Sequence, residues 1–389
     1  MPATTPSRAL AIDLIIPTLG NGGAQRMVSR VASHLAVKGH RVRVITFTGS
    51  DHRVVHRPDD AVEIVPIGTH SGTRFSMKAL VPVLRRLAPT IDEGGTEVVL
   101  AFQDIAGIPA LLTLSGSVPV AVAERHDPAT YSRPRLRAAL RQAIYPRAGA
   151  LVVQTRMLAA RYAPALQPLI RIIPNPCPDV SRTARPGKAS IASDGTRSPR
   201  RMVTVGRLER TKELGLLVDA AALAFAGRDD WQLDIHGVGP LESTLRAHIT
   251  ERGVEGRVRL CGHCEDVLDA LADAHLFVFP SSTEGFPNAL AEAVACGLPC
   301  IAFRGVSGVA ELVHDGENGE LLDEGARDPD NLARALSRAM DDDAGRARAG
   351  ARSLEIARTF ESERLLDDWE RLLVALVAND PRAGQARGR

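Results

Sequence analysis

Residues 275–299 of the chain, HLFVFPSSTEGFPNALAEAVACGLP, read as a strand, a loop and a helix in succession. The apolar run HLFVF is typical of a buried strand, and it ends at Pro280. The helix is expected to begin near Pro287, because the missing N–H of proline would be unpaired in a first helical turn anyway. Gly297 and Pro299 are expected to end it. The segment therefore predicts a βα unit of a parallel sheet, with a polar loop at the carboxyl end of its strand.

Two glutamates eight positions apart give this segment its chemistry. Glu284 falls on the loop, and Glu292 falls about two helical turns further on. The unpaired N–H groups at the helix start are suited to an anion such as phosphate, whereas the carboxylates could accept sugar hydroxyls. A partner of the helix dipole and a solvated helix residue would explain the same spacing. The residues of this candidate donor site are Glu284, Gly285, Phe286, Pro287, Asn288, Ala289 and Glu292.

The rest of the chain predicts two domains of this kind. A length of 389 residues exceeds one ordinary hydrophobic core. Strand-like and helix-like segments alternate in two series, and each series opens with a strand and a Gly-containing turn. We therefore predict an α/β protein with two doubly wound, Rossmann-like domains that face a central cleft. The predicted parts are an N-terminal domain over 1–177, a linker or mobile loop over 178–200, a C-terminal domain over 201–358, a final helix over 359–379 that packs back toward the N-terminal domain, and a disordered tail over 380–389.

Composition and charge exclude several classes of protein. The chain has 44% hydrophobic and 24% charged residues, which is ordinary for a soluble globular protein. A net charge of +2 argues against bulk binding of nucleic acid. No apolar run reaches the length of a membrane span. The N-terminal stretch ALAIDLIIPTL carries Asp13 and no basic leader, so it is expected to be a buried strand rather than a signal peptide. These features predict a cytoplasmic protein without an integral anchor.

The five cysteines leave two interpretations open. An odd number at loose spacing is not a secreted disulfide framework. Cys261 and Cys264 form a Cys-x-x-Cys pair that could be redox-active, or could bind zinc together with Cys296 and Cys300. Packing of the thiols as small apolar residues is the alternative.

The second domain opens with VTVGRLERTKELG, where a strand ends at Gly206. Glycine lets the backbone approach a ligand. Arg207 and Lys212 follow before the next helix, and they offer a bidentate donor and a point charge for a diphosphate. Two solvated cations in a charged connection would explain them equally well.

Two later strand ends in this domain carry weaker signals. DIHGVGPLE contains Gly237 and Gly239, and glycines at this spacing serve tight turns as well as ligands. CGHCEDV places His263 where backbone groups could meet the edge of a nucleobase. Capping of the next helix by Glu265 and Asp266 is the alternative there.

The first domain also has candidates at strand ends. TLGNGGAQRM places Gly22 and Gly23 between a strand and a helix, but the dinucleotide fingerprint is poorly met. A phosphate or a transferred group close to this backbone remains a hypothesis. AVAERHDPATY places His126 just after a strand, where it could donate to, accept from or orient a reacting sugar. A histidine without a function in a charged loop is the alternative.

Taken together, these segments resemble the family 4 glycosyltransferases, a retaining, metal-independent group with the GT-B fold. The Glu-x7-Glu pair, the GGAQR loop, the VGRL…K turn and the HGVGP turn occur in the family's order and span most of the chain. The resemblance implies that Gly22 and Gly23 belong to the loop that closes over the donor phosphates. Either Arg125 or His126 could occupy the family's sugar-facing histidine position, and we favour His126.

The resemblance also implies roles for the charged residues of the second domain. Glu292 would bind the nucleotide ribose, and Glu284 would lie beside the donor sugar. Arg207 and Lys212 would neutralise the diphosphate as it leaves, the role that a metal ion has elsewhere. No cofactor and no metal are then expected. The implied reaction is sugar transfer from a nucleotide-sugar donor to a glycan acceptor, with retention at the anomeric carbon.

The TLGNGGAQR, AERHDP and NPCP segments are similar to those of bacterial enzymes that extend lipid-linked oligosaccharides or exopolysaccharides. This similarity favours UDP as the donor nucleotide, with GDP next, and a polyprenyl-diphosphate-linked acceptor. Two basic stretches of the acceptor-side first domain could contact an anionic membrane or a lipid diphosphate, and solvated helix faces are the alternative. We therefore predict peripheral attachment to the inner face of the cell membrane. The basic residues are Arg74, Lys78, Arg85 and Arg86 in the first stretch, and Arg133, Arg135, Arg137, Arg141 and Arg147 in the second.

Other functions compete with this one. A nucleotide-sugar epimerase of the same architecture would convert the donor without an acceptor. A phosphorylase would need a pyridoxal-type lysine, and no lysine stands out. A non-catalytic nucleotide-sugar binding protein would not need the full set of Glu284, Glu292, Arg207 and Lys212.

Overall fold

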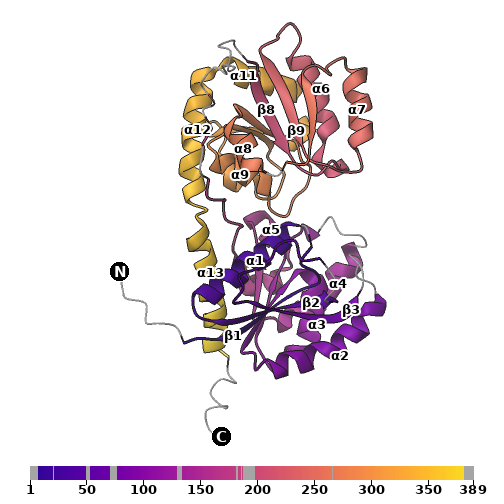
Figure 1. The fold of residues 1–389 in the computed structure, drawn as a ribbon, viewed down its shortest axis with the longest axis vertical. Helices are drawn as coiled ribbons and strands as arrows, with labels where there is room; N and C mark the ends of the chain where they lie inside the picture. Colours follow the sequence, from indigo (N-terminus) through magenta and orange to yellow (C-terminus); the bar gives the residue numbers. More distant parts are fainter. Residues whose placement is uncertain are drawn as a thin grey trace. The chain divides into compact units, whose positions relative to one another are not determined.

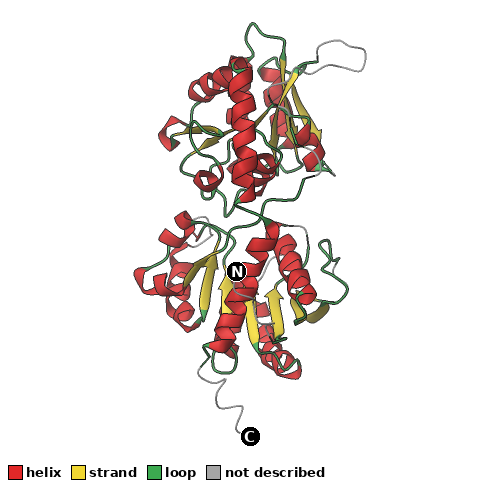
Figure 2. Ribbon diagram, turned by 90° about the vertical axis from the view of Figure 1, so that its left-hand side faces the viewer, coloured by secondary structure: helices red, strands yellow, loops and turns green. Residues whose placement is uncertain are grey.

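The chain divides into two compact units, each with its own parallel sheet. Unit 1 comprises Met1–Asn175 and Glu363–Arg389, and unit 2 comprises Pro176–Ser362. The computed structural model shows strands as a layer among helices in each unit (Figure 1, Figure 2). The structure describes residues 8–20, 22–49, 53–70, 77–128, 134–180, 183–184, 186, 198–264 and 266–380.

Unit 1 is built on a sheet of seven parallel strands in the order β3-β2-β1-β4-β5-β6-β7. The strands are β1 Ala11–Ile16, β2 Arg41–Thr48, β3 Glu63–His70, β4 Val98–Phe102, β5 Val120–Ala123, β6 Ala150–Val153 and β7 Ile170–Ile172. The helices are α1 Gly23–Val37, α2 Met77–Glu93, α3 Gln103–Leu114, α4 Pro134–Ile144, α5 Arg156–Ala160 and α13 Ser362–Ala378.

Alternate residues of these strands enter two separate cores, because successive side chains of a strand point to opposite faces. Leu14 of β1 packs with α1 and α13 on one face. Ile15, the next residue, packs with α2 and α3 on the other. Both faces of the sheet are therefore covered, as expected for an all-parallel sheet.

Helix α13, the last helix of the described residues, is part of the core of unit 1. Its Trp369 is fully buried and stacks on Phe102 of β4, with ring centroids 5.9 Å apart. Charged groups fix the same helix to α1 and to the segment that follows α1. The Asp367 carboxylate lies 2.9 Å from His34 Nε2, and the Glu370 carboxylate lies 3.1 Å from His40 Nε2.

Unit 2 has a sheet of six parallel strands in the order β10-β9-β8-β11-β12-β13. The strands are β8 Arg200–Val205, β9 Trp231–His236, β10 Val258–Gly262, β11 Leu276–Phe279, β12 Cys300–Phe303 and β13 Gly319–Leu322. The helices are α6 Leu214–Ala224, α7 Glu242–Glu251, α8 Val267–Ala272, α9 Asn288–Ala295, α10 Val309–Leu312, α11 Pro329–Asp341 and α12 Asp343–Arg358.

Each sheet has one point where the strand order reverses. In unit 1 the chain runs outward from β1 to β3, and then outward on the other side from β4. In unit 2 the corresponding pair is β8 and β11. Doubly wound sheets bind ligands outside the carboxyl ends of the strands at such switch points. The prediction of two doubly wound α/β sheets is therefore confirmed.

Candidate functional site

The switch point of unit 2 brings together two residues that lie 72 positions apart. Lys212 ends the 3-10 turn Arg210–Lys212 after β8, and Glu284 lies in the loop after β11. The Lys212 ammonium donates a hydrogen bond to the Glu284 carboxylate, and the two side chains are 18% and 16% exposed. The motifs VGRL…K and Glu-x7-Glu thus meet at one site.

The loop that carries Glu284 is fixed by groups from other segments. Arg327 donates to the carbonyls of Pro280 (2.8 Å) and Ser281 (2.9 Å), and its guanidinium lies 4.0 Å from the centroid of the Phe303 ring. Ser307 Oγ donates to the Gly285 carbonyl at 3.0 Å. The Glu284 loop is therefore fixed at its start by Arg327 and just after Glu284 by Ser307.

The start of α9 departs in detail from the expected row of unpaired amides. The Asn288 N–H donates to the Phe286 carbonyl at 3.0 Å, and Pro287 has no N–H to offer. The side chains of Phe286 and Pro287 are buried. Pro287 and Asn288 therefore offer no unpaired N–H to a phosphate, and the amides of Phe286 and Ala289 stay candidates.

Glu292 lies half-buried on α9, next to the NPCP segment. Cys177 of that segment lies close to it and donates from Sγ to the Ala291 carbonyl at 3.5 Å. Burial, reinforced by the charge of Glu292, raises the pKa of the Cys177 thiol to about 12. Cys177 is therefore a packed, protonated thiol beside the candidate ribose carboxylate.

The glycines after β8 and β9 allow two loops to pack closely. A Cβ on Gly237 would lie 1.8 Å from the Gly206 carbonyl oxygen, and one on Gly239 would lie 2.5 Å from the Leu208 oxygen. Gly237 also has a φ of +145°, which disfavours any other residue. Close packing of these loops thus explains Gly237 and Gly239 without a ligand. Arg207 lies on the loop after β8, and its side chain is 70% exposed.

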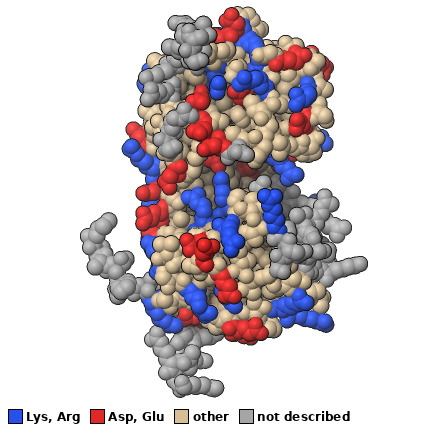
Figure 3. Space-filling view, viewed as in Figure 1, with Lys and Arg blue, Asp and Glu red and all other residues tan. Residues whose placement is uncertain are grey.

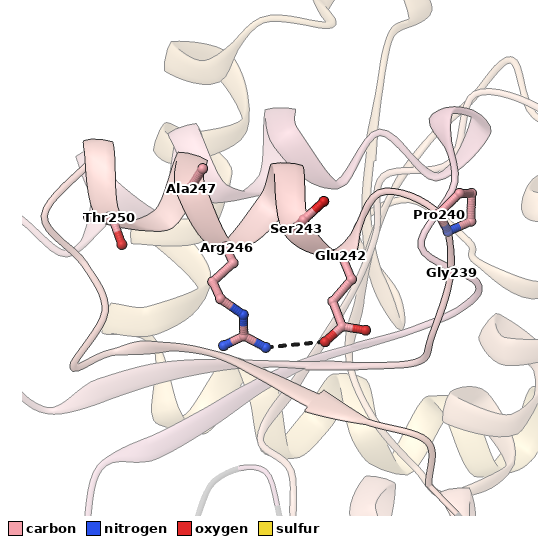
Figure 4. A pocket seen from close by; sticks show the side chains of 7 residues that line it. All are labelled: Gly239, Pro240, Glu242, Ser243, Arg246, Ala247 and Thr250. Carbon is pink, nitrogen blue, oxygen red and sulfur yellow. Dashed lines mark hydrogen bonds and ion pairs between the residues drawn. The ribbon is translucent and has the colours of Figure 1, made fainter.

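A groove of about 750 Å³ runs along α7 beside this turn. In Figure 4 the side chains of Glu242 and Arg246 point to the same side and are joined by an ion pair of 3.2 Å. The residues that line it are Gly239, Pro240, Glu242, Ser243, Arg246, Ala247 and Thr250. The groove therefore does not include Lys212, Glu284 or Glu292.

The end of β10 carries His263, which is exposed. Asp266 caps α8 by accepting from the Leu268 N–H (3.0 Å) and the Asp269 N–H (3.2 Å). Of the two interpretations of this segment, the structure shows helix capping, which Asp266 performs. Glu265 lies outside the described residues.

The four cysteines suggested as a zinc set do not share one environment. Cys296 and Cys300 are buried and Cys261 is exposed. The Cys261 thiol clusters with Asp234 and His236, with ligand atoms within 4.8 Å of one another. The Asp234 carboxylate, however, already accepts two hydrogen bonds from Arg259, at 2.7 and 2.9 Å. The positive charge of Arg259 opposes a cation at this position.

In unit 1 the glycine loop lies at the switch point of its sheet. Gly22 precedes α1 and Gly23 is its first residue. A Cβ on Gly22 would meet the flexible end of the Gln25 side chain at 2.4 Å, and its φ of 165° is extended backbone. The structure therefore does not require glycine at position 22, and the close approach of a ligand stays a hypothesis for this loop.

The AERHDP loop after β5 presents His126 and buries its charged neighbours. Glu124 accepts a hydrogen bond from the buried Tyr145 hydroxyl. The Asp127 carboxylate lies 3.1 Å from the Arg161 guanidinium. Both Glu124 and Asp127 are buried, and His126 between them is exposed.

Arg125 points into the core of unit 1. Its guanidinium lies 5.2 Å from the Phe102 ring centroid and 5.0 Å from that of Trp369, and it donates to Asn175 Oδ1 at 3.2 Å. Burial lowers the pKa of Arg125 to about 9. Of the two residues considered for the sugar-facing position, only His126 has its side chain at the surface of unit 1.

The basic stretches of unit 1 are only partly available to a membrane. Arg85, Arg135 and Arg147 are exposed. Arg86 is exposed as well, but it donates to the carbonyls of Ile67 and Gly68 of β3. Arg74 and Arg133, and the side chains of Lys78 and Arg137, lie outside the described residues.

Arg141 corrects the expectation for the second stretch, because it is 4% exposed and lies 3.6 Å from the Asp104 carboxylate. It faces inward to pair a buried charge, so it is not a surface contact. On the face in Figure 3, basic and acidic side chains are interspersed. Among the described residues, no helix combines the length and the apolar character needed to cross a bilayer.

The comparisons with known proteins place both units in one class. Residues 22–176 match the "Glycosyl transferase 4-like domain" model, and residues 192–355 match the "Glycosyl transferases group 1" model. The chain therefore belongs to the glycosyltransferases that carry this pair of domains, and the resemblance to family 4 is confirmed.

Two relatives are similar to most of the chain. An exopolysaccharide phosphotransferase of Streptomyces coelicolor is 30% identical over 77% of this chain, which spans 30% of that longer protein. A Campylobacter jejuni protein is 23% identical over 94% of this chain and 98% of its own length; its name is GalNAc-alpha-(1->4)-GalNAc-alpha-(1->3)-diNAcBac-PP-undecaprenol alpha-1,4-N-acetyl-D-galactosaminyltransferase.

Solved structures show the same two-domain fold. A sucrose-phosphate synthase of Thermosynechococcus elongatus has a TM-score of 0.80 at 20% identity, over 94% of this chain and 99% of its own. The HepE protein of Anabaena, in complex with UDP, has a TM-score of 0.74 at 21% identity and the same coverage. The predicted GT-B fold is therefore confirmed.

Sequence reasoning missed two residues of these sites, Gln103 and Arg327. Gln103 is the first residue of α3 and lies 2.7 Å from His126, measured between their Nε2 atoms. Arg327 fixes the Glu284 loop from 43 positions further along the chain. No local pattern marks either residue, because their partners come from other loops.

Proposed function

We propose that this protein is a retaining glycosyltransferase that moves a sugar from a nucleotide-diphosphate donor to a glycan acceptor. The observation that carries the proposal is the Lys212–Glu284 pair at the switch point of unit 2, followed by the half-buried Glu292 on α9. A cation beside two carboxylates offers what a nucleotide sugar needs: positive charge for the diphosphate, and acceptors for the hydroxyls of ribose and sugar.

The roles follow from the charges. Lys212 and the exposed Arg207 take up the negative charge that develops on the leaving diphosphate, so the reaction needs no metal ion. Glu292 accepts the ribose hydroxyls, and Glu284 lies beside the transferred sugar. In unit 1, His126 contacts that sugar during the reaction.

UDP is the proposed donor nucleotide, and the UDP complex of the Anabaena structure supports this choice. A lipid-linked acceptor is the proposed second substrate. The Campylobacter relative supports it, because its name describes a glycan on PP-undecaprenol. An acceptor of this kind would bring the enzyme to the inner face of the cell membrane as a peripheral protein.

The test combines binding with turnover. Purified protein is given UDP, GDP and their sugars in a thermal-shift panel, in which a specific ligand raises the Tm by occupying the native state. Nucleotide release is then measured with and without a polyprenyl-diphosphate-linked glycan, and the anomeric configuration of the product is read by NMR.

Glu292→Ala should abolish both the thermal shift and the turnover. The matched control is Glu320→Ala, which removes a β13 glutamate that pairs with Arg338 of α11. A Glu292→Ala variant that binds and transfers normally would contradict the site assignment. Donor conversion in the absence of acceptor would instead favour an epimerase, and an inverted product would contradict retention.

A further inference from the structure

Gln103 has a backbone conformation that side chains rarely adopt. Its φ is +70°, and among the described residues only Glu213 is another non-glycine with positive φ. Gln103 directly follows β4 at the switch point of unit 1. A left-handed residue that is not glycine is strained, and such strain persists where a function or its surroundings demand it.

The strained residue contacts the one exposed side chain of the AERHDP loop. Gln103 Nε2 lies 2.7 Å from His126 Nε2. In this arrangement the amide nitrogen donates and the ring nitrogen accepts, so the proton of a neutral His126 ring resides on Nδ1. The buried neighbours Glu124 and Asp127 fix the backbone on either side, and Gln103 fixes the ring itself.

We propose that Gln103 is a positioning residue that sets the orientation and the tautomer of His126. This inference rests on the proposed function, in which His126 contacts the transferred sugar. The tautomer decides which ring nitrogen can donate to a hydroxyl, and an amide at this position makes Nδ1 the donor. Glycine would adopt this backbone conformation without strain, so a purely structural role does not explain a glutamine at this position.

The direct test is the tautomer of His126 in the resting protein, read by long-range ¹H–¹⁵N NMR with His126→Ala as the assignment control. Wild type should show a protonated Nδ1. In Gln103→Glu the carboxylate can only accept, so the proton should move to Nε2. His40 is the internal reference, because its Nδ1 accepts from the Leu10 N–H at 3.1 Å and its proton should stay on Nε2 in both proteins. An unchanged His126 pattern in Gln103→Glu would overturn the inference.

A second variant separates positioning from structure. Gln103→Gly relieves the strain, so its Tm should stay level or rise by about 2–4 °C, whereas transfer should fall about 10- to 100-fold through loss of orientation. Full activity, or a fall in Tm of several degrees, would overturn the inference. If His126→Ala kept full activity, the proposed role of His126 would fail, while the tautomer result would still decide what Gln103 does to the ring.

Discussion

The Lys212–Glu284 ion pair makes an unusual prediction for Glu284→Gln: UDP should bind more tightly, although sugar transfer should slow. The Lys212 ammonium donates a hydrogen bond to the Glu284 carboxylate. A diphosphate must therefore compete with a carboxylate for the lysine, and it must also approach that negative charge. Glutamine keeps the shape of the side chain and removes both effects.

The magnitude follows from the burial of the pair. Two unit charges about 4 Å apart interact by about 4 kcal/mol at the effective dielectric of a protein surface. The two side chains remain 18% and 16% exposed, so solvent screens part of this energy. Fully exposed ion pairs stabilise by about 0–1 kcal/mol. Competition from Glu284 should therefore reduce the binding free energy of UDP by about 1–2 kcal/mol. That difference corresponds to a Kd for UDP about 5- to 30-fold lower in the variant.

Isothermal titration of UDP into wild type and Glu284→Gln measures this difference, and nucleotide release from the UDP-sugar measures transfer. The matched control is Glu320→Gln, which breaks the ion pair with Arg338 in the same unit and should leave the Kd unchanged. Weaker UDP binding by Glu284→Gln would refute the reasoning, because Glu284 would then support the nucleotide rather than compete with it.

Three further predictions concern the groups around the two sites. Trp369→Ala should lower the free energy of unfolding by about 3–5 kcal/mol in denaturant titration, because a fully buried ring is lost; a change below 1 kcal/mol would show that α13 is not part of the core. Arg327→Lys keeps the charge but loses the planar guanidinium fork whose two nitrogens each bond one carbonyl, so UDP affinity should fall and stability should drop by about 1–3 kcal/mol; wild-type affinity would mean that the Glu284 loop keeps its shape unaided. Cys177 should resist alkylation in the native protein, and its alkylation rate should not rise between pH 7 and pH 9, because a thiol whose pKa is raised to about 12 stays protonated over that range. Mass spectrometry measures the modification of each cysteine, and a Cys177 modified as fast as the exposed Cys261 would contradict this prediction.

The sequence predicted the sheets well, because buried parallel strands leave long apolar runs between glycine-containing turns. The helices were less visible. α12, Asp343–Arg358, is rich in Ala, Gly and Arg and has no wide apolar stripe, so nothing in its pattern marked it. α3, Gln103–Leu114, follows β4 with no loop between them, and it contains Pro109, which in a sequence argues against a helix.

Charge patterns predicted the exposed surface contacts least reliably. The Arg-rich stretch that suggested a membrane contact contains Arg141, which pairs with the buried Asp104, and Arg86 of the other stretch binds the backbone of β3. Arginine in a run looks the same whether it faces solvent or a buried carboxylate. The residue that pairs with the arginine determines whether it is buried, and that residue lies elsewhere in the chain.

The two candidate sites share one construction, which explains why their motifs are weak one at a time. In unit 1 the loop after β5 turns Glu124, Arg125 and Asp127 inward and leaves His126 outside. In unit 2 the loop after β11 is bound at its first two carbonyls by Arg327, and Glu284 extends from it. In both units a short loop presents one functional side chain in a fixed position because distant groups bind the rest of the loop. Loss of such a group would therefore mimic loss of the functional residue itself, and the conservative variants of Gln103 and Arg327 can tell these two effects apart.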